Sequence, residues 1–395
     1  YPPETITELL NEHFEQMAGI IAQYGGRIYK FIGDAIEAVF SEDNNFKESP
    51  SIRAFQAGNK MLEKLKEINK SREIRNLFQY KIGIGICKGE MFAGYVGNTN
   101  SRLDYAILGD AIKTAGKLES ASVQNPDYPL TVCRNTALDL REKNVKFLNV
   151  AGIDGFFIDK TEKHNIKDTI SDENGGLKQT FSTNSENIEK TIISSNYSNK
   201  KSAQEDALGT TSNETTTTEC ALMYIGIPNF TGITSSNTPH DAFEMLKNQI
   251  GILADLTIQE GGEVDKIIGE KMLSVFYKTS DDTNSVSNAC NAAIKIKDAR
   301  QNNILPMNYA IGINYGKVIT GFLGAGGKRD HTVIGDAVNT AARIESYAEL
   351  KAQNSLCLMS ENAAQQLLHD SYKLKKLDAV SLKGKENKIV VYEIC

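Results

Sequence analysis

The chain has 395 residues, of which 40% are hydrophobic and 24% are charged, and its formal net charge is -6. This length and composition predict two globular domains, and the acidic balance excludes the basic surface on which nucleic acid or an anionic membrane would bind. No apolar run approaches the roughly 18 residues that a membrane-spanning helix needs. The 6 cysteines form no CxxC pair, so we expect reduced thiols in a cytoplasmic chain, without disulfides or structural zinc.

A long amphipathic helix is the first predicted element, because the apolar side chains of residues 6–21 fall on one helical stripe. The pair Gly25–Gly26 predicts its end. Strands over 27–31 and 35–40 form a predicted hairpin whose tight turn displays Asp34. The other elements expected in this half are a helix over about 51–69, strands over 80–86 and 92–97, and a helix over about 111–119.

The chain contains an internal repeat. Three segments recur in the same order: residues 25–34 as 261–270, residues 82–86 as 310–314, and residues 107–111 as 333–337. Matching order and spacing in three separate segments indicates a duplicated domain. Helices interleaved with a hairpin and returning strands predict an α+β fold in each copy. The second copy also has an opening strand, 220–227, which the first copy lacks.

A linker is predicted between the copies. Residues 162–219 are rich in Ser, Thr, Asn and Lys and poor in large apolar side chains. Such a segment cannot bury enough apolar surface to offset its ordering entropy. The predicted domains are therefore residues 1–161 and 220–395.

Three motifs resemble those of the class III adenylyl and guanylyl cyclases. They are Lys-x-x-Gly-Asp at 30–34, Gly-Ile-x-x-Gly-x-x-x-x-Gly-x-x-Gly at 312–324, and Thr-Val-x-Gly-Asp-x-Val-Asn-x-Ala-Ala-Arg at 332–343. Thr332 stands where the mammalian cyclases with two unequal halves carry Asp, and this makes the chain more similar to the bicarbonate-responsive soluble adenylyl cyclases. The resemblance implies two ferredoxin-like-related domains that pair head to tail within the chain as a pseudodimer, with an active site at their interface.

The resemblance also implies a reaction and its residues. Adenylyl cyclases convert ATP to 3′,5′-cyclic AMP and pyrophosphate by in-line attack of the ribose 3′-hydroxyl, with two Mg²⁺ or Mn²⁺ ions clamping the attacking and leaving oxygens. The roles carried over are metal binding by Asp34, adenine recognition by Lys266 and Thr332, ribose orientation by Asn339, transition-state neutralisation by Arg343, and triphosphate binding by Lys383. The first copy would supply the metal-binding carboxylate, and the second copy would bind the nucleotide.

The second site of the pseudodimer is expected to be degenerate. Gly226 and Glu270 stand where the second copy should carry its metal ligands, and Gly226 offers no ligand. In the bicarbonate-responsive cyclases an anion occupies this place. The resemblance assigns a possible anion site to Lys30 and Lys117.

Two alternatives stay open. The first copy lacks its opening strand, and this strand should carry the second metal-binding Asp, which we expect upstream of Tyr1. One alternative is therefore a catalytically degenerate protein that binds nucleotides or anions. A guanylyl cyclase is the other, against which Lys266 and Thr332 speak, because guanine-selective members carry Glu and Cys there.

Overall fold

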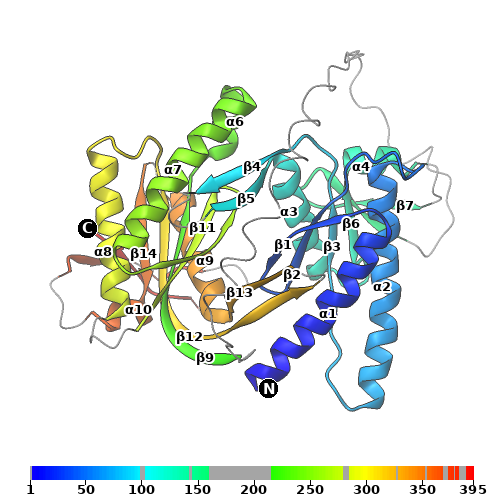
Figure 1. The fold of residues 1–395 in the computed structure, drawn as a ribbon, viewed down its shortest axis with the longest axis horizontal. Helices are drawn as coiled ribbons and strands as arrows, with labels where there is room; N and C mark the ends of the chain where they lie inside the picture. The colour runs from blue at the N-terminus through cyan, green and yellow to red at the C-terminus, as the bar shows by residue number, and fades with distance from the viewer. Residues whose placement is uncertain are drawn as a thin grey trace, which may run out of the picture.

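The computed structural model describes residues 2–97, 103–141, 145–159, 215–278, 284–325, 328–351, 354–367, 372–377, 379–381 and 388–395. Figure 1 shows two α/β units, repeat one up to residue 159 and repeat two from residue 215. Most of the predicted linker, and Lys383, lie outside the described residues. None of the described helices combines the length and the apolar character that crossing a membrane requires.

The helices of repeat one are α1 (Pro3–Gln23), α2 (Pro50–Ile74), α3 (Asp110–Gln124) and α4 (Arg134–Asp139). Its strands are β1 (Arg27–Ile32), β2 (Ala35–Val39), β3 (Ile84–Ile86), β4 (Phe92–Gly97), β5 (Leu103–Leu108), β6 (Leu130–Cys133), β7 (Lys146–Asn149) and β8 (Gly155–Asp159).

The helices of repeat two are α6 (Phe230–Ser236), α7 (Pro239–Gln259), α8 (Ser285–Gln301), α9 (Asp336–Lys351) and α10 (Glu361–Gln365). Its strands are β9 (Thr216–Gly226), β10 (Glu263–Ile268), β11 (Lys271–Tyr277), β12 (Ala310–Ala325), β13 (Lys328–Ile334), β14 (Leu356–Ser360), β15 (Leu374–Lys376) and β16 (Val391–Ile394).

Local sequence signals set the helix boundaries. α1 starts at a proline, whose missing N–H has no partner in a first turn anyway, and it ends where Gly25 adopts a φ of +75°. α2 follows Ser49, whose hydroxyl accepts a hydrogen bond from the N–H of Ile52 at 3.5 Å. The helix predicted over about 51–69 is confirmed and continues to Ile74.

The sheet of repeat two is continuous. Its strand order is β10-β11-β9-β12-β14-β16-β15, β13 pairs with β12, and β9 is antiparallel to both of its neighbours. Side chains alternate along β9: Met223 belongs to the buried cluster that contains Leu246 of α7, and Leu222 belongs to the separate cluster that contains Ala341 of α9. β9 begins at Thr216, ahead of the predicted start, because its β-branched threonines continue the ladder with β12.

The sheet of repeat one is divided into β1-β2, β3-β6-β8-β7 and β4-β5. By position in the repeat, β2 matches β11 and β3 matches the start of β12, yet no described strand of repeat one takes the place that β9 occupies in repeat two. The predicted strand 80–86 is therefore wrong in length: only Ile84–Ile86 is a strand, because one of its two partners is absent from the described sheet. A cavity of about 410 Å³ lies there, lined by Ile36 of β2 and Ile84 of β3 among others.

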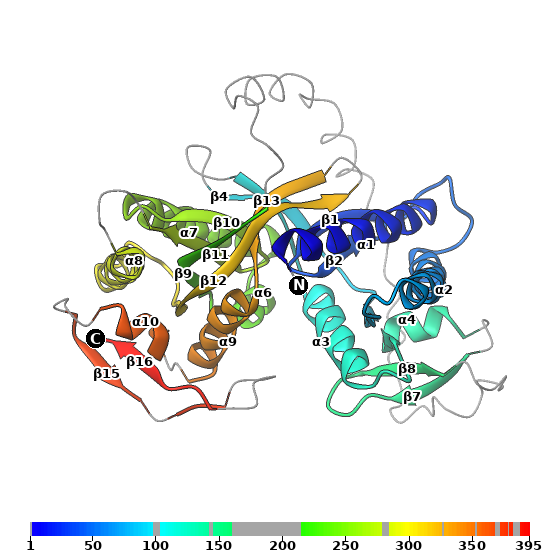
Figure 2. The ribbon, with the colours of Figure 1, turned by 90° about the horizontal axis from the view of Figure 1, so that it is seen from below.

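Each repeat packs a long helix on a hairpin of the other, as the side-by-side repeats of Figure 2 illustrate. α1 lies on β12, where Phe14 shares a buried apolar cluster with Leu323 and Ile334. In the reciprocal contact α7 lies on β4, and Val96 is buried in the same cluster as Leu246. This exchange brings the β1–β2 turn of repeat one toward α9 of repeat two.

Candidate active site

A cavity of about 700 Å³ lies between the repeats. Repeat one contributes α1, the β1–β2 turn and the segment before β3, and repeat two contributes β10, β13 and the start of α9. The cavity wall contains three of the predicted site residues, Asp34, Lys266 and Asn339. A carboxylate, an ammonium and an amide from two repeats thus meet one space that is large enough for a small organic ligand.

The β1–β2 turn presents Asp34 to this cavity. Gly33 has a φ of +61°, in the left-handed region that favours glycine, and the side chain that follows it is exposed. His13 of α1 is close by: burial lowers the pKa of His13, and the Asp34 carboxylate opposes that shift. The Nδ1 atom of His13 lies 3.0 Å from the hydroxyl of Tyr80, which also lines the cavity.

The described residues fit a metal site only in part. Asp34 is a carboxylate of the kind that binds Mg²⁺ or Mn²⁺. In the part of the chain that the structure describes, however, no group of three or more His, Cys, Asp or Glu side chains is placed to hold a metal ion. The predicted second carboxylate belongs to a strand that this part does not contain, so the pair of metal ions stays a prediction.

The residues predicted to read the base form a buried cluster with a third residue, Asp265. The ammonium of Lys266 donates to the hydroxyl of Thr332 at 2.5 Å, and that hydroxyl donates to the carboxylate of Asp265 at 2.9 Å. Lys266 and Asp265 form an ion pair at 3.2 Å, with side-chain exposures of 8% and 6%. Because the hydroxyl proton of Thr332 goes to Asp265, the oxygen of Thr332 is left as a hydrogen-bond acceptor.

A β-bulge makes this cluster possible. The pairing of β10 with β11 shifts register at Asp265, so two consecutive residues face one position of the partner strand. In a regular strand Asp265 and Lys266 would point to opposite faces of the sheet, whereas here both bind Thr332. Repeat one has the same bulge at Tyr29 of β1.

Asn339 and Arg343 lie one turn apart on α9 and therefore on the same side of the helix. Asn339 is exposed at the cavity, whereas Arg343 is half-buried and does not line it. Neither side chain forms a hydrogen bond or ion pair with another described residue. Both groups are therefore available to a ligand.

The two lysines predicted for an anion have different surroundings. Lys30 forms a buried ion pair with Asp104 at 2.9 Å and also donates a hydrogen bond to the carbonyl of Ile267, in repeat two. Lys117 is exposed on α3. An anion that binds Lys30 would have to displace Asp104.

An ion-pair cluster fills the space beside Gly226. A Cβ atom at Gly226 would collide with the carboxylate of Glu345, which would have to shift to admit a side chain there. Glu345 is fully buried and binds the ammonium of Lys271 at 2.7 Å, and this ammonium also binds Glu349 at 3.0 Å. Burial raises the pKa of Glu345, and Lys271 opposes that shift. The ammonium of Lys271 and its two carboxylate partners therefore occupy the space beside Gly226, where a metal-binding carboxylate was expected in this family.

Three residues of the site were not predicted: His13, Tyr80 and Asp265. His13 shares the buried face of α1 with Phe14, so its pattern is that of a core residue. Tyr80 reaches His13 only through the tertiary fold. Asp265 directly precedes Lys266, but its role depends on the bulge, and bulges have no reliable sequence signal in a single chain.

The chain is similar to known nucleotide cyclases in sequence. The family model described as adenylate and guanylate cyclase catalytic domain matches residues 1–154 and again 213–394. An adenylate cyclase of Anabaena cylindrica is 30% identical over 192 residues, which cover 45% of this chain and 37% of that protein. A terminal-differentiation-specific adenylate cyclase of Dictyostelium discoideum is 26% identical over 179 residues, which cover 44% of this chain and 8% of that protein. The chain therefore matches well under half the length of either relative.

Solved structures of cyclases match somewhat less than half of the chain. An adenylyl cyclase from P. aeruginosa has a TM-score of 0.41 and 22% identity, and the match covers 46% of this chain and 96% of that one. A guanylate cyclase domain from Catenaria anguillulae in complex with GTP has a TM-score of 0.41 and 23% identity, and the match covers 46% and 98%.

Proposed function

The chain belongs to the adenylate and guanylate cyclase catalytic-domain family, and from that premise we propose that it converts ATP to 3′,5′-cyclic AMP and pyrophosphate. In this proposal the repeats form a head-to-tail pseudodimer with one active site in the cavity between them. The observation that supports it most is the composition of that cavity. Asp34 comes from repeat one, and Lys266 and Asn339 come from repeat two.

The α9 residues suit the chemistry. Cyclisation needs the ribose 3′-hydroxyl held in line with the α-phosphorus, and it needs compensation for the charge that grows on the phosphorane. Asn339 carries the amide that can orient the ribose, and Arg343 carries the cation that can meet this charge. Metal ions, when bound, supply a clamp on the attacking and leaving oxygens, and Asp34 is the described residue that would hold them.

The cluster of Lys266, Thr332 and Asp265 favours adenine. Lys266 can donate to a ring nitrogen, and the Thr332 oxygen, whose own proton goes to Asp265, can accept from the exocyclic amine of adenine. Guanine carries a carbonyl in place of that amine, and its oxygen would face the lone pair of Thr332. A buried polar group left unpaired in this way discriminates strongly between the two bases.

The direct test is product formation by the purified chain with Mn²⁺ and either ATP or GTP, followed by mass spectrometry of the cyclic nucleotide. We expect cyclic AMP in excess of cyclic GMP, and we expect Arg343→Ala to lose it, which controls for a contaminating cyclase. Cyclic GMP in excess would make the chain a guanylyl cyclase. Nucleotide binding without any product would identify the catalytically degenerate alternative.

The bicarbonate site at Lys30 and Lys117 stays a separate proposal. If an anion binds Lys30, bicarbonate at fixed pH should change the cyclase rate, and Lys30→Ala should remove that change. Asp104→Asn should strengthen it, because the competing carboxylate of the ion pair is then gone. The absence of any bicarbonate response in both the wild type and Asp104→Asn would rule the site out.

A further inference from the structure

Two cysteines meet at the ends of neighbouring strands in repeat one. Cys87 directly follows β3, and Cys133 is the last residue of β6. These strands are parallel, with Ile86 opposite Val132, so the register places Cys87 opposite Cys133. Neighbouring strands run about 4.8 Å apart, which is within the range of Cα separations that a disulfide bridges.

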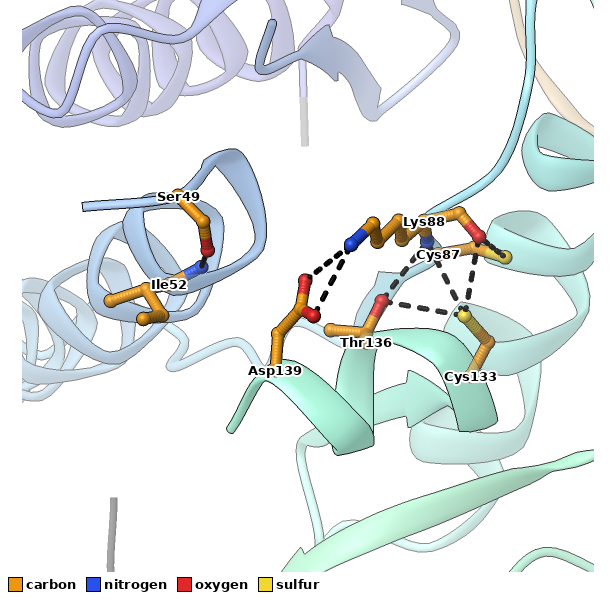
Figure 3. A network of polar contacts seen from close by, with 7 residues as sticks. All are labelled: Ser49, Ile52, Cys87, Lys88, Cys133, Thr136 and Asp139. Carbon is orange, nitrogen blue, oxygen red and sulfur yellow. Dashed lines mark hydrogen bonds and ion pairs between the residues drawn. The ribbon is translucent and has the colours of Figure 1, made fainter. Parts of the chain in front are cut away.

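The two thiols share polar contacts, as Figure 3 shows. Both sulfur atoms lie near the carbonyl oxygen of Lys88, at 3.9 Å from Cys87 and 3.8 Å from Cys133. The sulfur of Cys133 also accepts from the backbone N–H of Lys88 at 3.3 Å and lies 3.3 Å from the hydroxyl of Thr136. The ammonium of Lys88 turns away to the carboxylate of Asp139, at 2.9 Å.

These contacts divide the roles of the two sulfur atoms. A hydrogen bond from the Cys87 thiol, assisted by Thr136 and by the N–H of Lys88, lowers the pKa of Cys133 to about 5 although burial opposes the shift. Donating that hydrogen bond, together with burial, raises the pKa of Cys87. Cys133 accepts from the N–H of Lys88 and lies beside the hydroxyl of Thr136, so these contacts assign it the role of nucleophile and leave Cys87 as the resolving thiol.

Both cysteines are within reach of a small reagent. Cys87 is half-buried, and both side chains line a cavity of about 580 Å³. Neither thiol lines the proposed nucleotide cavity, so the cyclase chemistry does not explain the pair. Cys395, at the end of the chain, is an exposed thiol that serves as an internal reference.

We propose that Cys87 and Cys133 are a peroxide-sensitive dithiol that closes to a disulfide. The thiolate sulfur of Cys133 attacks one oxygen of hydrogen peroxide, the O–O bond breaks, and the sulfur becomes a sulfenic acid while the departing hydroxide takes up a proton to form water. The sulfur of Cys87 then attacks that of Cys133. The S–S bond forms, the S–O bond breaks, and the departing hydroxide takes the Cys87 proton to form a second water. Two thiols are oxidised, one peroxide is reduced, and a dithiol reductant reverses the change.

The first test maps the oxidised bond. The full chain is treated with hydrogen peroxide, the remaining thiols are alkylated, and peptides are identified by mass spectrometry. We expect peptides joined through Cys87 and Cys133 that separate on reduction, while Cys395 stays an alkylatable thiol. In Cys87→Ser, dimedone should trap a sulfenic acid at Cys133. The proposal is overturned if the wild type yields no joined peptide, or if Cys395 is oxidised as fast as Cys133.

A second test asks whether Thr136 positions the thiolate. Alkylation of an ordinary thiol slows roughly tenfold for each pH unit below its pKa, whereas that of a thiolate with a low pKa stays nearly constant. Between about pH 8 and about pH 6 we expect Cys133 to keep its alkylation rate, whereas a free small-molecule thiol in the same solution should lose most of its rate. Thr136→Val should restore part of the pH dependence at Cys133. A slope at wild-type Cys133 equal to that of the free thiol contradicts the assigned nucleophile.

Discussion

Asp265 determines how base selectivity has to be tested. It binds both Lys266 and Thr332 in a buried cluster, so Lys266→Glu alone would leave two carboxylates side by side with little solvent. We therefore combine Lys266→Glu and Thr332→Cys with Asp265→Asn. This triple variant reverses donor and acceptor at the purine edge and should shift kcat/KM from ATP toward GTP. An unchanged ratio in a folded triple variant would contradict the adenine assignment.

Arg343 should act in the transition state more than in binding. Its side chain forms no ion pair with a described residue, so a charge that develops on the nucleotide is its available partner. Arg343→Ala should lower kcat by roughly two to three decades while ATP affinity changes little. Lys351→Ala, an exposed cation at the end of the same helix, is the matched control. A defect confined to KM would make Arg343 a ground-state phosphate anchor.

His13 should make folding stability depend on pH. Burial lowers the pKa of His13 in the folded chain. Above the unfolded-state pKa of about 6.5 the imidazole is neutral in both states, and its contribution to stability is complete. As the pH falls below that value, the unfolded chain takes up a proton that the folded chain does not, so the free energy of unfolding decreases. Urea unfolding over this range should show a shallower decrease in His13→Gln, and equal slopes would contradict this.

At the scale of elements, the contact of α7 with β4 depends on Gly94. A Cβ atom at Gly94 would collide with the ring of Phe243 on α7, so in Gly94→Val this ring has to move away from the hairpin. We expect the free energy of unfolding to drop by about 1–3 kcal/mol, as overpacking typically costs, and cyclase activity to drop with it. In the control Gly116→Ala, the added Cβ meets nothing within 4 Å and a helix position gains alanine. Thermal melting of both variants tests this contact. Equal melting temperatures for Gly94→Val and Gly116→Ala would refute it.

Elements defined by local signals could be predicted from the sequence. The first helix, the hairpin around Asp34 and the strand Phe92–Gly97 are confirmed, because periodicity, glycine stops and a tight turn are all local. The length of β3 could not be predicted, since a strand extends only as far as its partners do. The early start of β9 depends in the same way on the ladder with β12.

The site was predictable where motifs carry it. Asp34, Lys266 and Asn339 do line one cavity, although they are far apart in the sequence. Asp265 escaped prediction because a bulge, which is a property of the paired strands, turns its side chain to Thr332. His13 could be assigned to the site only once the packing of the repeats was known.

At the scale of the whole molecule, the corresponding positions of the two repeats, Asp34 and Glu270, differ in exposure and in partners. Glu270 occupies in repeat two the position that Asp34 has in repeat one. Asp34 is exposed in the cavity, whereas Glu270 is buried and forms an ion pair with Lys113 of repeat one at 2.6 Å. Asp34 is thus open to the cavity between the repeats, whereas at the mirror position a buried carboxylate forms an ion pair that joins the repeats.

The central claim is that a single active site takes its metal-binding carboxylate from repeat one and its nucleotide contacts from repeat two. The most direct measurement is Mn²⁺-dependent cyclic AMP formation by the two mirror variants, Asp34→Asn and Glu270→Gln, with binding of an ATP analogue measured alongside. Asp34→Asn should abolish product formation, and Glu270→Gln should keep the wild-type rate or lose only what a weaker interface costs. Equal loss in both variants, or full activity in Asp34→Asn, would contradict the shared single site.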